Sequence, residues 1–169
     1  VNGFLTPCQY DKNSGNVIFQ KKPSSNDKNN SEQKESWQLT YEEGRKVIES
    51  MRFAETSNLF GNEKDNSFKS TLGAIYQTFD GKDVYPTLEE KAANLLYMLV
   101  KNHSFNDGNK RIAAALFIYF LERNNLLFDK NKNPIIDNNT LAAMTLMIAL
   151  SKPEEKEIMC LLVLNMLNN

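Results

Sequence analysis

The chain has 169 residues, 41% of them hydrophobic, with 20 Lys and Arg residues against 21 Asp and Glu residues. This composition predicts one folded domain, and the formal net charge of -1 leaves no excess of positive charge for sequence-independent nucleic-acid binding. Two cysteines, Cys8 and Cys160, cannot form the disulfide framework of a small secreted protein, so we expect a reducing, cytoplasmic setting. Because no apolar run approaches the roughly 20 residues of a membrane span, we expect no membrane association.

The beginning of the chain differs in character from the rest. Residues 6–11 and 16–20 favour the strands of a small hairpin. Residues 23–36 are almost wholly polar and cannot bury enough apolar surface to offset the entropy of ordering, which is typical of a linker. The sequence therefore predicts an N-terminal extension over residues 1–36, followed by a helical domain over residues 37–169.

Apolar residues in this second part recur at the three- and four-residue steps of helices. The expected helices cover residues 40–56, 87–103, 109–123, 139–150 and 153–167. Three of them begin with a Ser/Thr-x-x-Glu spacing, in which each side chain can bind the other residue's backbone amide. The three pairs are Thr40 with Glu43, Thr87 with Glu90, and Ser151 with Glu154.

One segment interrupts the helical pattern. An Asp80-Gly81 pair, typical of a tight turn, lies between the β-favouring residues 74–79 and 82–86. We expect a short hairpin or extended flap here, directly before the helix that ends at His103. The fold class predicted for the chain is mainly α, a helical bundle with a short β-hairpin flap.

The most informative string is HSFNDGNKR, residues 103–111, which joins two strongly apolar helices. A helix start exposes unpaired N–H groups and a positive dipole end, and Gly108 allows an anion to approach the backbone closely. Lys110 and Arg111 add positive charge. Asp107 offers the carboxylate oxygen that Mg²⁺ takes when it also binds substrate phosphates. The string therefore predicts a site for a magnesium-bound nucleotide.

His103 is the only histidine of the chain, and histidine is the residue type that ordinarily changes charge near neutral pH. It is thus the candidate general base, able to take a proton from an attacking hydroxyl. The structural alternative is that a lone histidine at the end of an apolar helix face is a hydrogen-bonded core residue. By the same standard Asp107-Gly108 is a turn with a helix cap, and Phe105 is an apolar anchor that pins the loop between the two helices.

Residues 103–111 also resemble the signature of the Fic/Doc proteins, His-x-Phe-x-Asp/Glu-Gly-Asn-Gly/Lys-Arg, at all seven specified positions. The string DVYPTLEEKA, residues 83–92, is similar to the segment that precedes this signature in the family. The resemblance covers about residues 40–128.

The resemblance implies a mostly helical Fic fold that transfers part of ATP, or of another nucleoside triphosphate, onto a Ser, Thr or Tyr hydroxyl of a protein. By analogy His103 is the base that activates the hydroxyl, and Asp107 holds Mg²⁺. Gly108 and Asn109 would shape the anion site, and Arg111 would bind the nucleotide phosphates.

The resemblance leaves the transferred group open between AMP, which is usual in the family, and the terminal phosphate, which the Doc branch transfers. Lys110 and Ala114 stand where AMP-transferring members have a glycine and a second arginine, and both resemble the Doc branch. Gly108 follows the AMP-transferring pattern.

The resemblance also implies protein partners. The flap of the family lies before the motif helix, so residues 74–85 are the expected place for a target segment to add as an extra strand. Many Fic proteins carry an inhibitory Ser/Thr-x-x-x-Glu-Gly/Asn helix, but here Leu39 stands where Glu43-Gly44 would require Ser or Thr. A separate inhibitor protein, an inhibitory segment outside this sequence, or no inhibition are all compatible with this.

The function predicted from the sequence is a Fic/Doc-type transferase that uses a magnesium-bound nucleotide. The alternative is a non-catalytic module that keeps the site for nucleotide or phosphate binding and regulation. A helical DNA-binding domain is a third reading, which the apolar character of residues 112–121 disfavours.

Overall fold

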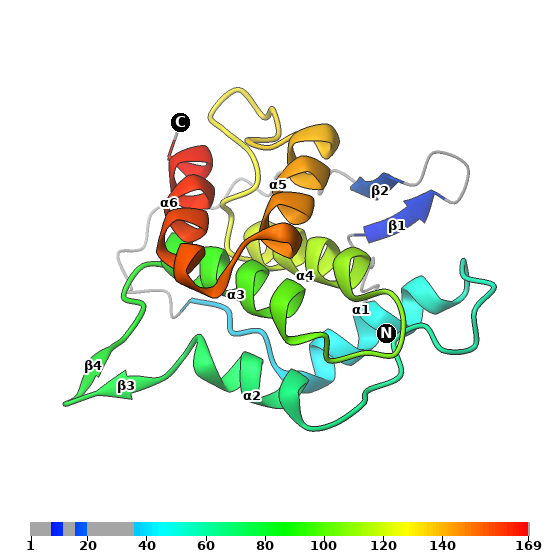
Figure 1. Cartoon of the computed structure of the whole chain (residues 1–169). Helices are drawn as coiled ribbons and strands as arrows, with labels where there is room; N and C mark the ends of the chain where they lie inside the picture. Colours follow the sequence, from blue (N-terminus) through cyan, green and yellow to red (C-terminus); the bar gives the residue numbers. More distant parts are fainter. Residues whose placement is uncertain (1–7, 12–15, 20–35, 169) are drawn as a thin grey trace.

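The computed structural model of the chain describes residues 8–11, 16–19 and 36–168 and is mainly helical (Figure 1). The helices are α1 (Tyr41–Arg52), α2 (Ser67–Ala74), α3 (Leu88–Asn102), α4 (Asn109–Arg123), α5 (Asn138–Leu150) and α6 (Lys156–Leu167), with a 3-10 turn η1 (Pro153–Glu155) before α6. This confirms the predicted fold class. Within these described parts, no helix has both the length and the apolar character needed to cross a bilayer.

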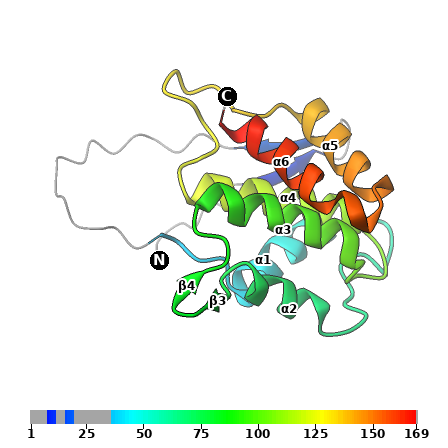
Figure 2. The ribbon, with the colours of Figure 1, turned by 60° about the vertical axis from the view of Figure 1, so that its left-hand side comes forward.

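Helices α3 and α4 form the centre of the domain. They pack on each other, with α5 and α6 on one side and α1 and α2 on the other, as both views of the ribbon show (Figures 1 and 2). The largest fully buried side chains include Phe60, Phe68, Phe105, Phe117 and Phe120. Because the loop between α3 and α4 carries residues 103–108, the two central helices place the predicted site at one end of the core.

The N-terminal hairpin is confirmed by the pairing of β1 (Cys8–Asp11) with antiparallel β2 (Asn16–Phe19). Its turn and residues 23–35 of the expected linker lie outside the described residues, so the domain boundary stays a prediction. Trp37 lies before the first helix, and its ring packs edge-on against Tyr119 at a centroid distance of 5.2 Å.

At two of the three expected helix starts, the threonine hydroxyl caps the helix. Thr40 Oγ1 accepts a hydrogen bond from the Glu43 amide (3.2 Å), and Thr87 Oγ1 accepts one from the Glu90 amide (3.1 Å). The carboxylate of Glu43 accepts a hydrogen bond from the Tyr119 hydroxyl at 2.9 Å. The Glu43 side chain, which the sequence pattern places at the cap of α1, therefore takes part in the packing of α1 against α4 instead.

The third expected cap is wrong. Ser151 Oγ donates to the carbonyl of Ile148 (2.6 Å) at the end of α5, and the Lys152 amide donates to the carboxylate of Glu155 (2.8 Å). Because the 3-10 turn η1 begins here, the capping pair is Lys152 with Glu155 and not Ser151 with Glu154.

Helix α1 also ends earlier than expected, at Arg52 rather than near residue 56. The amides of Ala54 and Glu55 bond to carbonyls three residues back, which closes the helix in a tight turn.

The expected strand over residues 74–79 is wrong in its first part, because Ala74 is the last residue of α2. Buried residues Phe68, Leu72 and Ile75 recur at steps of three and four, the spacing of a helix face. The β-favouring residues that follow form only the short strands of the next hairpin. The sequence predicts no element for residues 57–73, which include most of α2.

The second hairpin is confirmed in a shorter form. Strands β3 (Thr78–Phe79) and β4 (Lys82–Asp83) pair antiparallel, and Asp80 and Gly81 between them both have positive φ, 52° and 75°. Positive φ at both central residues is the geometry of the type I′ turn that an Asp-Gly pair favours. The buried ammonium of Lys91 on α3 holds the base of the hairpin, through Asp83 Oδ2 (3.1 Å) and the carbonyl of Tyr85.

Candidate functional site

His103 lies at the C-terminal end of α3 and faces solvent. Its backbone is left-handed, with φ 46° and ψ 51°, and this conformation ends the helix. Such a conformation costs a non-glycine residue about 1–2 kcal/mol, so the surrounding structure has to hold it. Because its side chain is exposed to solvent, the structural alternative, in which His103 is a core residue, is wrong.

Two buried residues directly after His103 hold the loop. The side chain of Ser104 accepts a hydrogen bond from the Ser67 hydroxyl at the start of α2 (2.6 Å). Phe105, 1% exposed, packs against the ring of Phe68 with a centroid distance of 5.1 Å. Phe105 is thus the apolar anchor that the sequence predicts.

Asn109, the first residue of α4, fixes the shape of the loop from the other side. Its side-chain oxygen accepts a hydrogen bond from the Phe105 amide (2.9 Å), and its side-chain nitrogen donates to the Phe105 carbonyl (2.8 Å). Gly108 is the cap of α4, with φ 88°, and its carbonyl accepts the first helical bond from Ile112 (2.8 Å). The amides that follow Gly108 are those that an α-helix leaves without a partner in its first turn.

The charged side chains of the motif do not all have the same surroundings. Arg111 Nη1 lies 2.6 Å from Glu55 Oε1, and Arg111 Nη2 lies 3.7 Å from Asp107 Oδ1. Glu55 is 11% exposed, whereas the Arg111 and Asp107 side chains are about 40% exposed, at 40% and 39%. Lys110 is exposed and has no ion pair among the described residues. The site therefore combines a carboxylate open to solvent, Asp107, with a guanidinium that a nearly buried carboxylate holds in place.

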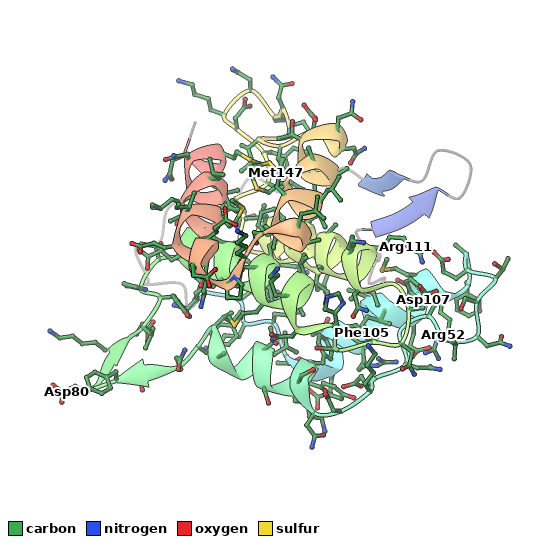
Figure 3. The ribbon with its side chains drawn as sticks, viewed as in Figure 1. Arg52, Asp80, Phe105, Asp107, Arg111 and Met147 are labelled. Carbon is green, nitrogen blue, oxygen red and sulfur yellow. The ribbon has the colours of Figure 1, made fainter. Side chains whose placement is uncertain are left out.

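The structure brings a third segment to the motif loop, residues 53–65 between α1 and α2. The Gly61 amide donates to the carbonyl of Asp107 (3.1 Å), and the Asn106 amide donates to the carbonyl of Asn62 (2.9 Å). The Lys64 amide bonds the carbonyl of Ser104 at 2.9 Å. Figure 3 shows Phe105, Asp107 and Arg111 gathered on the same side of the molecule as Arg52, the last residue of α1.

Helix α1 fixes this segment in turn. Arg45 Nη1 donates to the carbonyl of Gly61 (2.8 Å), and Tyr41 donates its hydroxyl to the Glu63 carboxylate (2.6 Å). The hydrogen bond to Glu63 is the main cause that raises the pKa of the Tyr41 hydroxyl above its ordinary value. The segment is thus attached both to α1 and to the motif loop.

Sequence reasoning found the motif residues His103, Asp107, Gly108, Asn109, Lys110 and Arg111, and the structure places them in one loop and the first turn of α4. It missed Glu55 and Phe60, both of which contact Arg111 from the segment between α1 and α2. No local sequence pattern predicts these contacts, since Glu55 and Phe60 lie in a loop and are more than 50 residues from Arg111 along the chain.

The β3–β4 hairpin does not lie beside the motif loop. It projects from the N-terminal end of α3, whereas His103 lies at the C-terminal end, and both ribbon views show the two places apart (Figures 1 and 2). Figure 3 likewise places Asp80, in the hairpin turn, on the opposite side from Asp107.

The residues present fit a magnesium-bound nucleotide. Mg²⁺ is commonly bound by one or two carboxylates together with substrate phosphates, and the partly exposed Asp107 offers such a carboxylate next to the start of α4. The positive end of the α4 dipole and the first-turn amides are the usual partners of phosphate oxygens.

Comparison with known proteins identifies the class of this domain. Residues 38–121 match the Fic/DOC family, and this part of the chain is a Fic/Doc domain. The chain is also similar to a protein named Toxin Doc from Mycolicibacterium smegmatis (strain ATCC 700084 / mc(2)155), with 51% identity over 47 residues. That match covers 28% of this chain and 36% of the toxin, so the chain spans about a third of its relative's length in the comparison. No solved structure matches the chain.

Proposed function

We propose that this Fic/Doc domain transfers AMP, or the terminal phosphate, from a magnesium-bound nucleoside triphosphate such as ATP to a Ser, Thr or Tyr hydroxyl of a protein. The observation that carries the proposal is the placement of His103. Its side chain faces solvent at the left-handed end of α3, in the loop that leads to Gly108 and the unpaired amides of α4. A base beside an anion-binding helix start is the arrangement that transfer of a phosphoryl or nucleotidyl group requires.

In the proposed reaction the neutral imidazole of His103 takes the proton of the target hydroxyl. The hydroxyl oxygen attacks the α-phosphorus, the bond from that phosphorus to the α–β bridging oxygen breaks, and pyrophosphate leaves with AMP transferred. In the Doc-like alternative the oxygen attacks the γ-phosphorus and the nucleoside diphosphate leaves. The transferred group is AMP if the α-phosphorus lies in line with the hydroxyl oxygen, and the terminal phosphate if the γ-phosphorus does.

The other motif residues would bind the nucleotide. Asp107 would hold Mg²⁺, which neutralises phosphate charge when bound. Gly108 and Asn109 would shape the site around the first-turn amides of α4, and the side chains of Lys110 and Arg111 would attract the phosphate oxygens. The positions of these residues in one loop and helix start support the assignment.

The proposal is tested with ATP labelled on either the α- or the γ-phosphate, incubated with the protein, Mg²⁺ and a cell lysate. Label on protein is counted above that of the same lysate without the protein. Such label from α-labelled ATP only indicates AMP transfer, and such label from γ-labelled ATP only indicates phosphorylation. His103→Ala should abolish labelling and leave nucleotide affinity nearly unchanged. His103→Gly is the matched control for the backbone, because glycine adopts a φ of 46° without strain, so strain at this position cannot explain loss of labelling there.

The same experiment addresses the alternative function, a non-catalytic nucleotide- or phosphate-binding regulatory module. Binding of ATP by the wild-type protein without transfer of either label would favour this module and reject the transferase. Equal labelling by the wild type and His103→Ala would remove His103 as the base.

We also propose a toxin-like role under the control of a separate inhibitor protein, in the cytoplasm. The similarity to a protein named Toxin Doc supports this role. Glu43, the glutamate that an inhibitory helix would use, is bonded to Tyr119 instead. Expression of the wild-type chain in a bacterial host should arrest growth, and His103→Ala should not.

The target protein is proposed to dock on the flap, residues 74–85. The hairpin strands have two residues each, so Phe79, which is 80% exposed, offers more contact surface than the strand edges do. Phe79→Ala should then reduce labelling of the target and leave ATP binding unchanged, whereas equal labelling would reject docking at the hairpin.

A further inference from the structure

The ring of Phe60 forms the inner wall of the motif loop. Phe60 is fully buried and comes from the segment between α1 and α2, not from either helix of the motif. A Cβ atom at Gly108 would lie 2.3 Å from Phe60 Cε2, so the ring fills the space that a side chain there would need. The guanidinium of Arg111 lies over the same ring, with Cζ 5.0 Å from its centroid.

The backbone of Phe60 is fixed from two directions. Its carbonyl accepts hydrogen bonds from Arg52 Nε (3.1 Å) and Arg52 Nη2 (2.9 Å) at the end of α1. On the other side Phe60 forms a parallel bridge with Asp107, in which the Gly61 amide donates to the Asp107 carbonyl at 3.1 Å. The backbone of Phe60 therefore cannot move away from the loop without breaking hydrogen bonds on both sides.

We propose that Phe60 is a positioning residue of the phosphate site: its ring holds Gly108 and the Arg111 guanidinium in a fixed relation to the first turn of α4. The inference rests on the proposed function of that site. A cation over an aromatic face is attracted to it, and donors that are already oriented bind an anion without reorganisation. Since Phe60 is buried, it acts through Gly108 and Arg111 and does not touch the nucleotide.

The proposal is tested with Phe60→Leu, which keeps an apolar side chain and removes the ring. The matched control is Phe120→Leu, because Phe120 is equally buried but lies near the far end of α4. Affinity for Mg-ATP is measured by calorimetric titration at a temperature at which all three proteins are folded. Phe60→Leu should weaken binding by about three- to tenfold, in the range of a lost cation–π contact, and Phe120→Leu by less than about twofold. Equal affinities for the wild type and Phe60→Leu overturn the proposal.

A second measurement does not depend on nucleotide. A proton over a ring is shifted by the ring current, so the NMR signal of the Arg111 Nε–H should move in Phe60→Leu and stay in place in Phe120→Leu. An unmoved signal in Phe60→Leu overturns the inference. If the wild type binds no Mg-ATP, the proposed function fails, while this signal still tests the contact of Phe60 with Arg111. Phe60→Met, with a flexible apolar side chain, serves if Phe60→Leu does not fold.

Discussion

Replacing Gly108 by alanine tests the packing of the motif loop most directly. Two separate costs are expected. The first is the left-handed backbone, φ 88°, which disfavours any side chain by about 1–2 kcal/mol. The second is overlap, because the new Cβ would lie 2.3 and 2.5 Å from two carbons of the Phe60 ring, where 3.5–4.0 Å is an ordinary contact. Overpacking of this kind costs about 1–3 kcal/mol, and the lower entropy of alanine in the unfolded chain offsets about 0.4–1 kcal/mol, so Gly108→Ala should lower the free energy of unfolding by roughly 2–4 kcal/mol.

The chain provides a matched control in Gly81, at the hairpin turn. Gly81 has a similar φ of 75°, but a Cβ there would meet nothing within 4 Å. Gly81→Ala should therefore show only the backbone cost, about 1 kcal/mol after the lower entropy of alanine in the unfolded chain is subtracted. The difference between the two variants measures the overlap with Phe60.

The assay is urea denaturation of the wild type and both variants, with the free energy of unfolding extrapolated to water. A double variant, Gly108→Ala with Phe60→Leu, should be less destabilised than the sum of the single changes, because the leucine leaves room for the new Cβ. If Gly108→Ala costs no more than Gly81→Ala, the ring does not limit the space at Gly108 and the reasoning is refuted.

Three further predictions concern groups outside the loop. Tyr119→Phe should lower the free energy of unfolding by about 1 kcal/mol, because it removes the hydrogen bond to the Glu43 carboxylate; denaturation in urea measures this. Asp137 is the cap of α5, and hydrogen bonds from Thr140 lower the pKa of its carboxyl group. The stability that this cap adds is present above about pH 4, the pKa of aspartate in the unfolded chain, and is lost as the pH falls through the lower pKa of the folded state. Asp137→Asn should therefore lose less stability than the wild type between pH 6 and pH 3. Burial raises the pKa of the Cys160 thiol, so in a Cys8→Ser background it should react more slowly with iodoacetamide at pH 8 when folded than in urea.

Each of these predictions has a contrary outcome. Tyr97→Phe is the control for Tyr119, since the Tyr97 hydroxyl donates no hydrogen bond among the described residues, and equal losses would mean that the bond adds no stability. Parallel pH dependence of the wild type and Asp137→Asn would show that the cap does not titrate. Equal alkylation rates in the folded and unfolded chain would show that the Cys160 thiol is accessible.

The helices that the sequence predicts best are those in which several local signals agree. Helix α4 has the predicted bounds, and α3 differs by one residue at each end, because long apolar faces and definite start and stop residues coincide there. Helix α2 was missed because it has only eight residues and its buried face runs directly into β-favouring residues. The third cap failed because a 3-10 turn replaced the first turn of the expected helix.

The candidate site could be predicted only as far as it is contiguous in sequence. Residues 103–111 form one loop and helix start, and their type and order indicate a phosphate site without knowledge of the fold. Glu55 and Phe60 could not be predicted, because a loop has no periodicity and contacts over more than 50 residues depend on how α1 packs against α4. The left-handed backbone conformation of His103 could not be predicted either, since no local sequence pattern marks a helix end at which histidine adopts it.

If the target protein docks on the hairpin as proposed, the length of α3 limits which substrates can reach His103. A helix of 15 residues is roughly 22 Å long, and α3 has the hairpin at its beginning and His103 at its end. An extended peptide advances about 3.3 Å per residue, so fewer than about seven residues cannot bridge the two places. Short synthetic peptides around an acceptor hydroxyl should thus be poor substrates, and a folded polypeptide with a broad surface should be a good one. The length of α3 would thus exclude acceptors that are too short to contact the hairpin and His103 at the same time.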